Sequence, residues 1–171
     1  NAIPAGDTFI NSDEFITRQG STSAILVHGV KPNEPGNMST IWSIVGFPNT
    51  CMAVPVWVKG GKNLPKLLIA DETGNAPLNK IALKLKNRCY PIKRSSGYKY
   101  LMMSKLINSE KKGYVQKIEK AERVIFRKTE EMLKEWREIK PTKKEIETYY
   151  NWLDEFVYDK YASGFGMKQK N

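Results

Sequence analysis

The sequence has few of the residues from which catalytic and metal-binding sites are usually built. Among its 171 residues there are one histidine and two cysteines. The two cysteines do not follow a zinc-binding spacing. His28 lies in a strand-like stretch without an acidic or nucleophilic neighbour, so we expect a structural histidine. The phosphate-binding loop, the dinucleotide fingerprint, H-E-x-x-H and G-x-S-x-G are all missing, and we predict no metal site and no cofactor.

Long hydrophobic runs and a visible signal peptide are missing as well. No apolar stretch approaches the roughly 20 residues needed to cross a bilayer, so no membrane span is predicted. The first residue is Asn rather than Met, and we expect the chain to be a processed product or a piece of a longer protein. The contents of hydrophobic residues, 40%, and of aromatic residues, 11%, are those of a folded protein.

The two cysteines leave two alternatives open. Cys51 and Cys89 can form a disulfide in an oxidising compartment, or both can be buried thiols. The sequence alone does not place their Cα atoms within bonding range.

The net charge of +10 is unevenly distributed. Residues 1–75 hold 5 Lys and Arg against 6 Asp and Glu, whereas residues 76–171 hold 23 against 12. We expect a strand-rich part over 1–75 and a basic helical part over 76–171, which packs on the same domain. The basic part can contact an anionic partner or can be a solvated lysine-rich surface. Basicity alone identifies no ligand, and we do not expect nucleic acid.

Three runs of β-branched and aromatic residues predict three strands, over 22–30, 39–47 and 53–58. Proline, glycine and asparagine separate the runs, so we expect an antiparallel hairpin followed by one more extended segment. Both faces of the first two runs are largely apolar. This pattern predicts strands that are covered on both sides.

The second part of the chain reads as helices. Asn75 as an N-cap, with Pro77 in the first turn, predicts a helix that ends before Pro91. A short helix is expected over 98–107. A long helix over 114–139 follows from apolar residues at three-, four- and seven-residue steps. Thr142 and Glu145 form a capping-box pattern for a last helix, which should pair antiparallel with the long one, with a frayed tail from residue 162.

The central stretch RQGSTSAILVHGVKPNEPGNMSTIWSIVGFPNTCMAVPVWVKGGKNLP, followed by ADETGNAPL, ALKLKNRCYPI, EMLKEW and YNWLDEF, resembles a known family. It is similar to the C-terminal part of secreted bacterial linear amide C–N hydrolases. These include choloylglycine hydrolases, penicillin V acylases and acyl-CoA:6-aminopenicillanate acyltransferases. The resemblance implies an α+β fold, the αββα sandwich of N-terminal-nucleophile hydrolases, and a periplasmic or secreted location in a bacterium.

The resemblance also implies that the catalytic nucleophile lies outside this chain. The family uses an N-terminal Cys whose own α-amino group is the base, whereas residue 1 here is Asn and both cysteines are internal. The nucleophile is therefore expected in a preceding segment or a companion chain, and this chain alone should be inactive. The family has an Arg at the mouth of the active site, and Arg18 matches it, with Ser21 and Ser23 as further substrate-binding candidates.

Two functions are consistent with these observations. The first is the C-terminal segment of an enzyme that acts on an amide-containing small molecule. The alternative is a non-catalytic binding or docking unit whose basic helical half contacts an anionic partner, through residues such as Lys93, Arg94, Lys111 and Lys112. If the chain docks on a missing half, the isolated chain should expose an apolar sheet edge and self-associate as a homo-oligomer.

Overall fold

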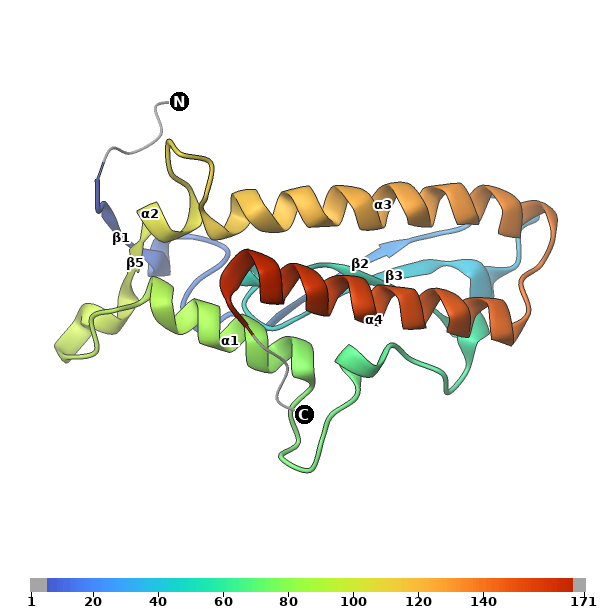
Figure 1. Cartoon of the computed structure of the whole chain (residues 1–171), viewed down its shortest axis with the longest axis horizontal. Helices are drawn as coiled ribbons and strands as arrows, with labels where there is room; N and C mark the ends of the chain where they lie inside the picture. Colours follow the sequence, from blue (N-terminus) through green and yellow to red (C-terminus); the bar gives the residue numbers. More distant parts are fainter. Residues whose placement is uncertain (1–5, 168–171) are drawn as a thin grey trace.

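A three-stranded antiparallel sheet lies at the centre of the structure, in the order β2-β3-β4 (Figure 1). The computed structural model describes residues 6–167. Leu26 lies opposite Trp42, and Trp42 lies opposite Pro55. The predicted hairpin with a third extended segment is confirmed. The strands are β2 (Ser23–His28), β3 (Thr40–Val45) and β4 (Val54–Trp57).

Two long antiparallel helices cover one face of this sheet (Figure 1). The ring of Trp42 on β3 meets Phe126 on α3 edge to face, with 4.8 Å between centroids. At the start of α4, Thr142 and Glu145 form the predicted capping box, in which each backbone N–H donates to the other residue's side chain. The α+β class and the C-terminal helical hairpin are therefore as predicted. The helices are α1 (Pro77–Cys89), α2 (Met103–Leu106), α3 (Tyr114–Glu138) and α4 (Lys143–Phe165).

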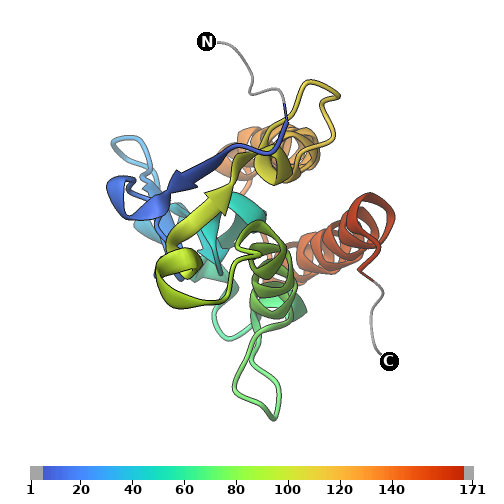
Figure 2. The ribbon, with the colours of Figure 1, turned by 90° about the vertical axis from the view of Figure 1, so that its left-hand side faces the viewer.

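A second, two-stranded sheet closes one end of the molecule, seen from that end in Figure 2. Its strands are antiparallel, with Ile10 opposite Leu101. This pair joins the first residues of the described range to the region between α1 and α2. The strands are β1 (Phe9–Asn11) and β5 (Tyr100–Met102). Short 3-10 helices lie between the larger elements, at Ser12–Glu14, Gly36–Met38, Pro48–Thr50, Val58–Gly60, Lys66–Leu68 and Ser95–Lys99.

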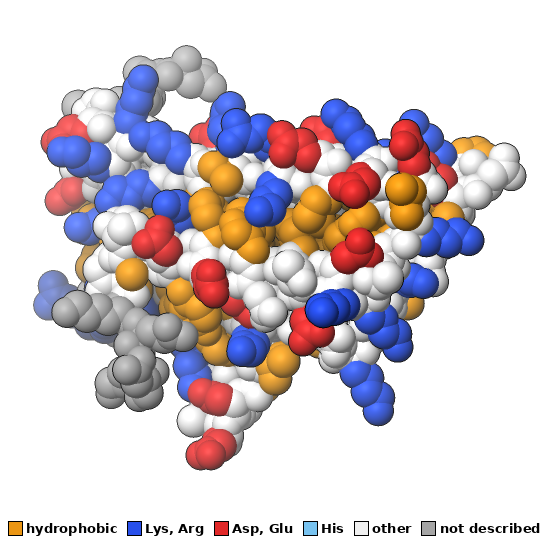
Figure 3. Space-filling model, turned by 45° about the vertical axis from the view of Figure 1, so that its right-hand side comes forward, with side chains coloured by type: hydrophobic (Ala, Val, Ile, Leu, Met, Phe, Trp, Pro, Cys, Tyr) orange, Lys and Arg blue, Asp and Glu red, His pale blue; other side chains and the backbone are white. Residues whose placement is uncertain are grey.

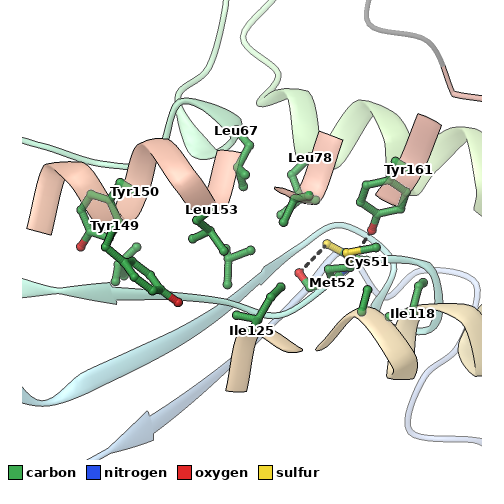
Figure 4. Packing of buried hydrophobic residues seen from close by; sticks show 14 of the residues in the cluster. Cys51, Met52, Leu67, Leu78, Ile118, Ile125, Tyr149, Tyr150, Leu153 and Tyr161 are labelled. Carbon is green, nitrogen blue, oxygen red and sulfur yellow. Dashed lines mark hydrogen bonds between the residues drawn. The ribbon is translucent and has the colours of Figure 1, made fainter. Parts of the chain in front are cut away.

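The core is centred on β4. Its last residue, Trp57, is 2% exposed. The ring stacks on Tyr150 and meets Trp136 and Tyr149 edge to face, and its Nε1 donates to Thr40 Oγ1 at 2.9 Å. Rings in such arrangements stabilise by about 0.5–1.5 kcal/mol per pair beyond the burial of their area. Figure 4 shows the neighbouring part of the core, where residues from α3, α4 and the β4 region point toward one another.

The outer edge of β4 is sealed by side chains. The outward N–H of Ala53 donates to Glu122 Oε1 at 2.7 Å, and that of Trp57 donates to Tyr150 Oη at 3.0 Å. The residue between them on the same edge is Pro55, which has no N–H. Just before β4, the N–H of Met52 donates to Tyr161 Oη at 2.8 Å. Every outward donor along this edge is thus paired or missing, so β4 has no free donor to offer a further strand.

The other edge strand, β2, is open. Ile25, Leu26 and Val27 are 70%, 61% and 63% exposed, although they alternate between the two faces of the sheet. The prediction that the first strand is covered on both sides is therefore wrong for β2. The reason is its position, because α3 and α4 reach across β3 and β4 and leave β2 at the margin. Within residues 6–167, no side chain is hydrogen-bonded to its outer edge.

Other expectations also differ from the structure. The predicted helix over 98–107 is instead a 3-10 turn, the strand β5 and the single turn α2. The N-cap of α1 is Ala76 rather than Asn75, whose side chain accepts a hydrogen bond from Asn79. The last helix continues to Phe165 and ends at Gly166, whose φ of 65° suits glycine. Residue 1, and the predicted tail beyond residue 167, lie outside the described residues.

The cysteines follow the second of the two alternatives. Cys51 and Cys89 are both buried free thiols. They belong to different hydrophobic clusters, Cys51 beside β4 and Cys89 beside Tyr90 and Leu101, so the structure contains no disulfide between them.

Candidate functional site

The residues that precede β2 form a tight polar turn. Arg18 N–H donates to Ser21 Oγ at 3.1 Å, and Ser21 N–H donates back to Arg18 O at 2.9 Å. The Ser21 hydroxyl also lies 3.4 Å from the carbonyl oxygen of Ile16. The Arg18 side chain is exposed, and Ser23 begins β2 opposite Val45. The structure therefore brings Arg18 and Ser21 together, with Ser23 two residues further along.

An apolar pocket of about 530 Å³ adjoins this turn. Its volume falls within the range of small-molecule sites. Ile16 and Thr17 form part of its wall and lead directly into Arg18. Ile16 is 97% exposed, so this wall presents apolar surface to solvent. The remaining lining comes from the β1–β5 end of the molecule and the start of α3: Ile10, Glu14, Phe15, Asn49, Leu101, Met103, Leu106, Ile107 and Val115.

Two carboxylates with restricted access to solvent, those of Glu122 and Asp154, are engaged in structure. Burial raises the pKa of Glu122, whose carboxylate accepts from the N–H of Ala53. Burial also raises the pKa of Asp154, although its two oxygens accept from the N–H groups of Lys66 and Leu67. Asp154 thus caps the 3-10 turn Lys66–Leu68 from α4. Such contacts fix the chain and engage both carboxylates as acceptors.

Neither cysteine is placed as a nucleophile. Burial raises the pKa of both Cys51 and Cys89 to about 12, so almost none of either thiol is ionised near neutral pH. His28 is exposed on the open strand β2. Within residues 6–167, no three His, Cys, Asp or Glu side chains gather as a metal site. The arrangement can bind and orient an apolar group beside a cation, but the described residues do not assemble a nucleophile and a base.

A groove between α3 and α4 was not foreseen from the sequence. One part is a pocket of about 380 Å³, with Met52, Ala121 and Val124 among its apolar lining. Lys117, Lys120 and Lys160 stand around it. In Figure 3, a band of hydrophobic side chains runs between the two helices. The basic residues singled out from the sequence lie elsewhere, exposed in the loop after α1 and the loop before α3.

Comparisons with known proteins add no identification, because no family model, no curated protein and no solved structure matches the chain. No helix within residues 6–167 has the length and hydropathy that crossing a membrane requires.

Proposed function

We propose that this chain is the C-terminal part of an enzyme that hydrolyses or transfers acyl groups at linear amide C–N bonds. In this proposal, the sheet β2-β3-β4 belongs to the sandwich of an N-terminal-nucleophile hydrolase. A preceding segment or companion chain carries the nucleophilic Cys, and the assembled protein is periplasmic or secreted in a bacterium. The family resemblance of the strand block supplies the chemistry of the proposal.

The observation that carries the proposal is the difference between the two edges of the sheet. Glu122 and Tyr150 occupy the outward donors of β4. No strand of the described part of the chain pairs with the outer edge of β2, which has three consecutive exposed apolar residues, Ile25, Leu26 and Val27. Natural edge strands are usually protected by charge, proline, a bulge or a covering element. The residues of β2 read SAILVH, which includes neither a Lys, Arg, Asp or Glu nor a proline. An edge of this kind is expected where another strand belongs.

The substrate would meet the start of β2. Arg18 directly follows Ile16 and Thr17, which line the apolar pocket, and in this proposal its guanidinium orients a carbonyl or carboxylate. The acyl part of an amide would occupy the pocket lined by Phe15, Leu101 and Ile107. Ser21 and Ser23 follow Arg18 toward β2, the strand beside which the missing segment would pair.

The first test is intact mass spectrometry of the protein from its native source under denaturing conditions. A second chain that begins with Cys, recovered together with this one, supports the proposal. The two chains produced together should then cleave acyl amides, and neither should do so alone. A species of about 19.5 kDa without a companion would refute the proposal for this molecule.

A pair of variants tests the role of β2. Ile25→Lys places a charge where the partner strand should pack, and Ile139→Lys makes the same change at a residue of similar exposure, 70% against 72%. Full burial of an isoleucine stabilises by about 2 kcal/mol. Burial of the exposed part of Ile25 would then contribute about 1.4 kcal/mol, or tenfold in affinity. Ile25→Lys should weaken companion binding at least tenfold and Ile139→Lys should not. Equal effects would contradict docking at β2.

The alternative function is a docking unit that contacts an anionic partner through the basic helical half. The lysine-lined groove between α3 and α4 is the specific observation that favours it. Association through such a surface should weaken steeply with salt, whereas amide hydrolysis should not depend on these lysines.

A further inference from the structure

The groove between α3 and α4 has an aromatic floor. On α4, the rings of Trp152 and Phe156 stack at 5.2 Å between centroids, with an interplanar angle of 25°. Both side chains are half-buried. Toward the end of α4, the floor continues into the pocket beside Val124 and Phe165. We call this surface, from Trp152 to Phe165 on α4 and from Lys117 to Lys128 on α3, the α3–α4 groove.

Lysine side chains lie directly over this floor. The ammonium of Lys128, on α3, lies 4.0 Å from the ring centroid of Trp152 on α4. Lys160 lies 5.1 Å from the centroid of Phe156, and Lys117 lies 5.4 Å from that of Phe165. Each pair is a cation–π contact of about 0.5–1 kcal/mol at an exposed site. The lysines thus cover the outer part of rings that also pack on Tyr149, Tyr114 and Tyr161.

The charges are only partly neutralised. Lys160 pairs with Asp159 at 2.9 Å, and Lys117 donates to the carbonyl oxygen of Gly164 at 2.8 Å. Lys120 is exposed at the rim of the pocket. Among the residues that line the pocket there is no Asp or Glu. The pocket within the groove therefore combines an apolar floor with a positive rim.

The spacing of the lysines indicates the shape of the ligand. Lys117 and Lys128 are eleven residues apart on α3, which corresponds to about 16 Å or three helical turns. A single-chain anionic amphiphile has one head group and can satisfy only one end of this row. A peptide helix with apolar residues on one face and carboxylates beside them can place its apolar face on the rings and a carboxylate at each lysine.

We propose that the α3–α4 groove docks an acidic amphipathic helix of a partner protein, about three turns long. Its Asp or Glu side chains would pair with Lys117, Lys120, Lys128 and Lys160. This pairing would draw Lys128 and Lys160 off the rings of Trp152 and Phe156, and the apolar residues of the docked helix would pack on the uncovered rings. Glu131 and Glu135 follow Lys128 at three and seven residues on α3, and their like charges would repel the carboxylates of the partner and limit the site. The proposal stands independently of the amide chemistry and of the open strand β2.

The test uses fluorescein-labelled peptides of about 18 residues and fluorescence anisotropy with the whole chain. One peptide has leucines at helical spacing flanked by Glu, a second has Gln in place of Glu, and a third is a scramble of the first. The first should bind, and raising the salt from roughly 50 mM to roughly 500 mM should weaken it about tenfold. The Gln peptide should bind at least tenfold more weakly, and the scramble should not bind.

Variants locate the contact. Lys128→Glu should weaken binding of the acidic peptide at least tenfold, because a like charge then faces the partner. Lys134→Glu is the matched control, since Lys134 is exposed about 220° around α3 from Ala121, away from the groove. It should leave binding unchanged. Phe156→Ala tests the floor and should weaken both the acidic and the Gln peptide, with circular dichroism showing that the variant is folded.

Three results would overturn the proposal. The first is equal binding of the acidic and Gln peptides, because the lysines would then contribute nothing. The second is an equal loss with Lys128→Glu and Lys134→Glu, which would place the contact outside the groove. The third is binding of decanoate to the groove without binding of the acidic peptide, which would identify the ligand as a single-chain anionic amphiphile.

Discussion

The hydroxyl of Tyr161 offers a direct test of how the last helix is attached to the sheet. It accepts from the N–H of Met52 at 2.8 Å and donates to the carbonyl oxygen of Thr50 at 3.1 Å. The side chain is 0% exposed, and burial raises its pKa well above the usual value. Tyr161→Phe keeps the ring and leaves two backbone groups unpaired. Each such group costs about 1–3 kcal/mol, so we expect a loss of about 2–6 kcal/mol.

Two further variants turn this into a graded series. Tyr150→Phe removes one hydrogen bond, from Trp57 N–H, and should cost about 1–2 kcal/mol. Tyr158 is half-buried and its hydroxyl has no hydrogen bond to another residue of the described range, so Tyr158→Phe should change stability by less than about 0.5 kcal/mol. For a chain of this length, the Tyr161→Phe loss corresponds to a fall in Tm of roughly 4–24 °C. Equal midpoints for the three variants in urea denaturation would refute the reasoning.

Three other predictions follow from burial and geometry. Cys51 and Cys89 should not react with Ellman's reagent at pH 8 in the native protein, because their pKa of about 12 keeps them protonated, and both should react in urea. Glu122 has a raised pKa when folded, so the native state binds a proton more readily than the unfolded state. The Tm of the wild type should therefore rise relative to that of Glu122→Gln as the pH falls from 7 toward 4.5. A difference in Tm that does not change with pH would contradict this. Gly46→Ala should destabilise by about 1–3 kcal/mol, because the new Cβ would lie 2.6 Å from that of Ala82 at a φ of 140°; an unchanged thermal midpoint would show that the neighbouring helix can move away.

The elements with local signals could be predicted closely. The helix expected over 114–139 is α3, Tyr114–Glu138, because its apolar periodicity and the glycine before it are contained in the segment itself. The capping box at Thr142 likewise depends on residues three apart. The three strands of the central sheet fall inside the predicted runs, since β-branched residues and turn residues mark both their positions and their ends.

The features that could not be predicted depend on contacts between residues that are far apart in the sequence. The strand β5 lies in a stretch whose local pattern predicts a helix, because its pairing partner β1 is about 90 residues away. The exposure of β2 depends on how far α3 and α4 extend across the sheet, which the local sequence of β2 does not indicate. The ammonium of Lys128 on α3 lies over the ring of Trp152 on α4, a contact that no pattern within the helix predicts. The polar turn at Arg18 and Ser21 could be proposed from resemblance, but the apolar pocket beside it combines residues from four separate segments.

The sealed edge of β4 has a consequence for assembly. A sheet with two free edges can add copies at both sides without limit, and that is how fibres grow. Here Tyr150, Glu122 and Pro55 remove one of the two growing ends. If two copies pair through β2 about a two-fold axis, the result is a six-stranded sheet that ends in β4 on both sides. No further copy could then add to this sheet, because both of its edges would be β4. Pairing through the exposed strand would therefore give a dimer rather than a polymer.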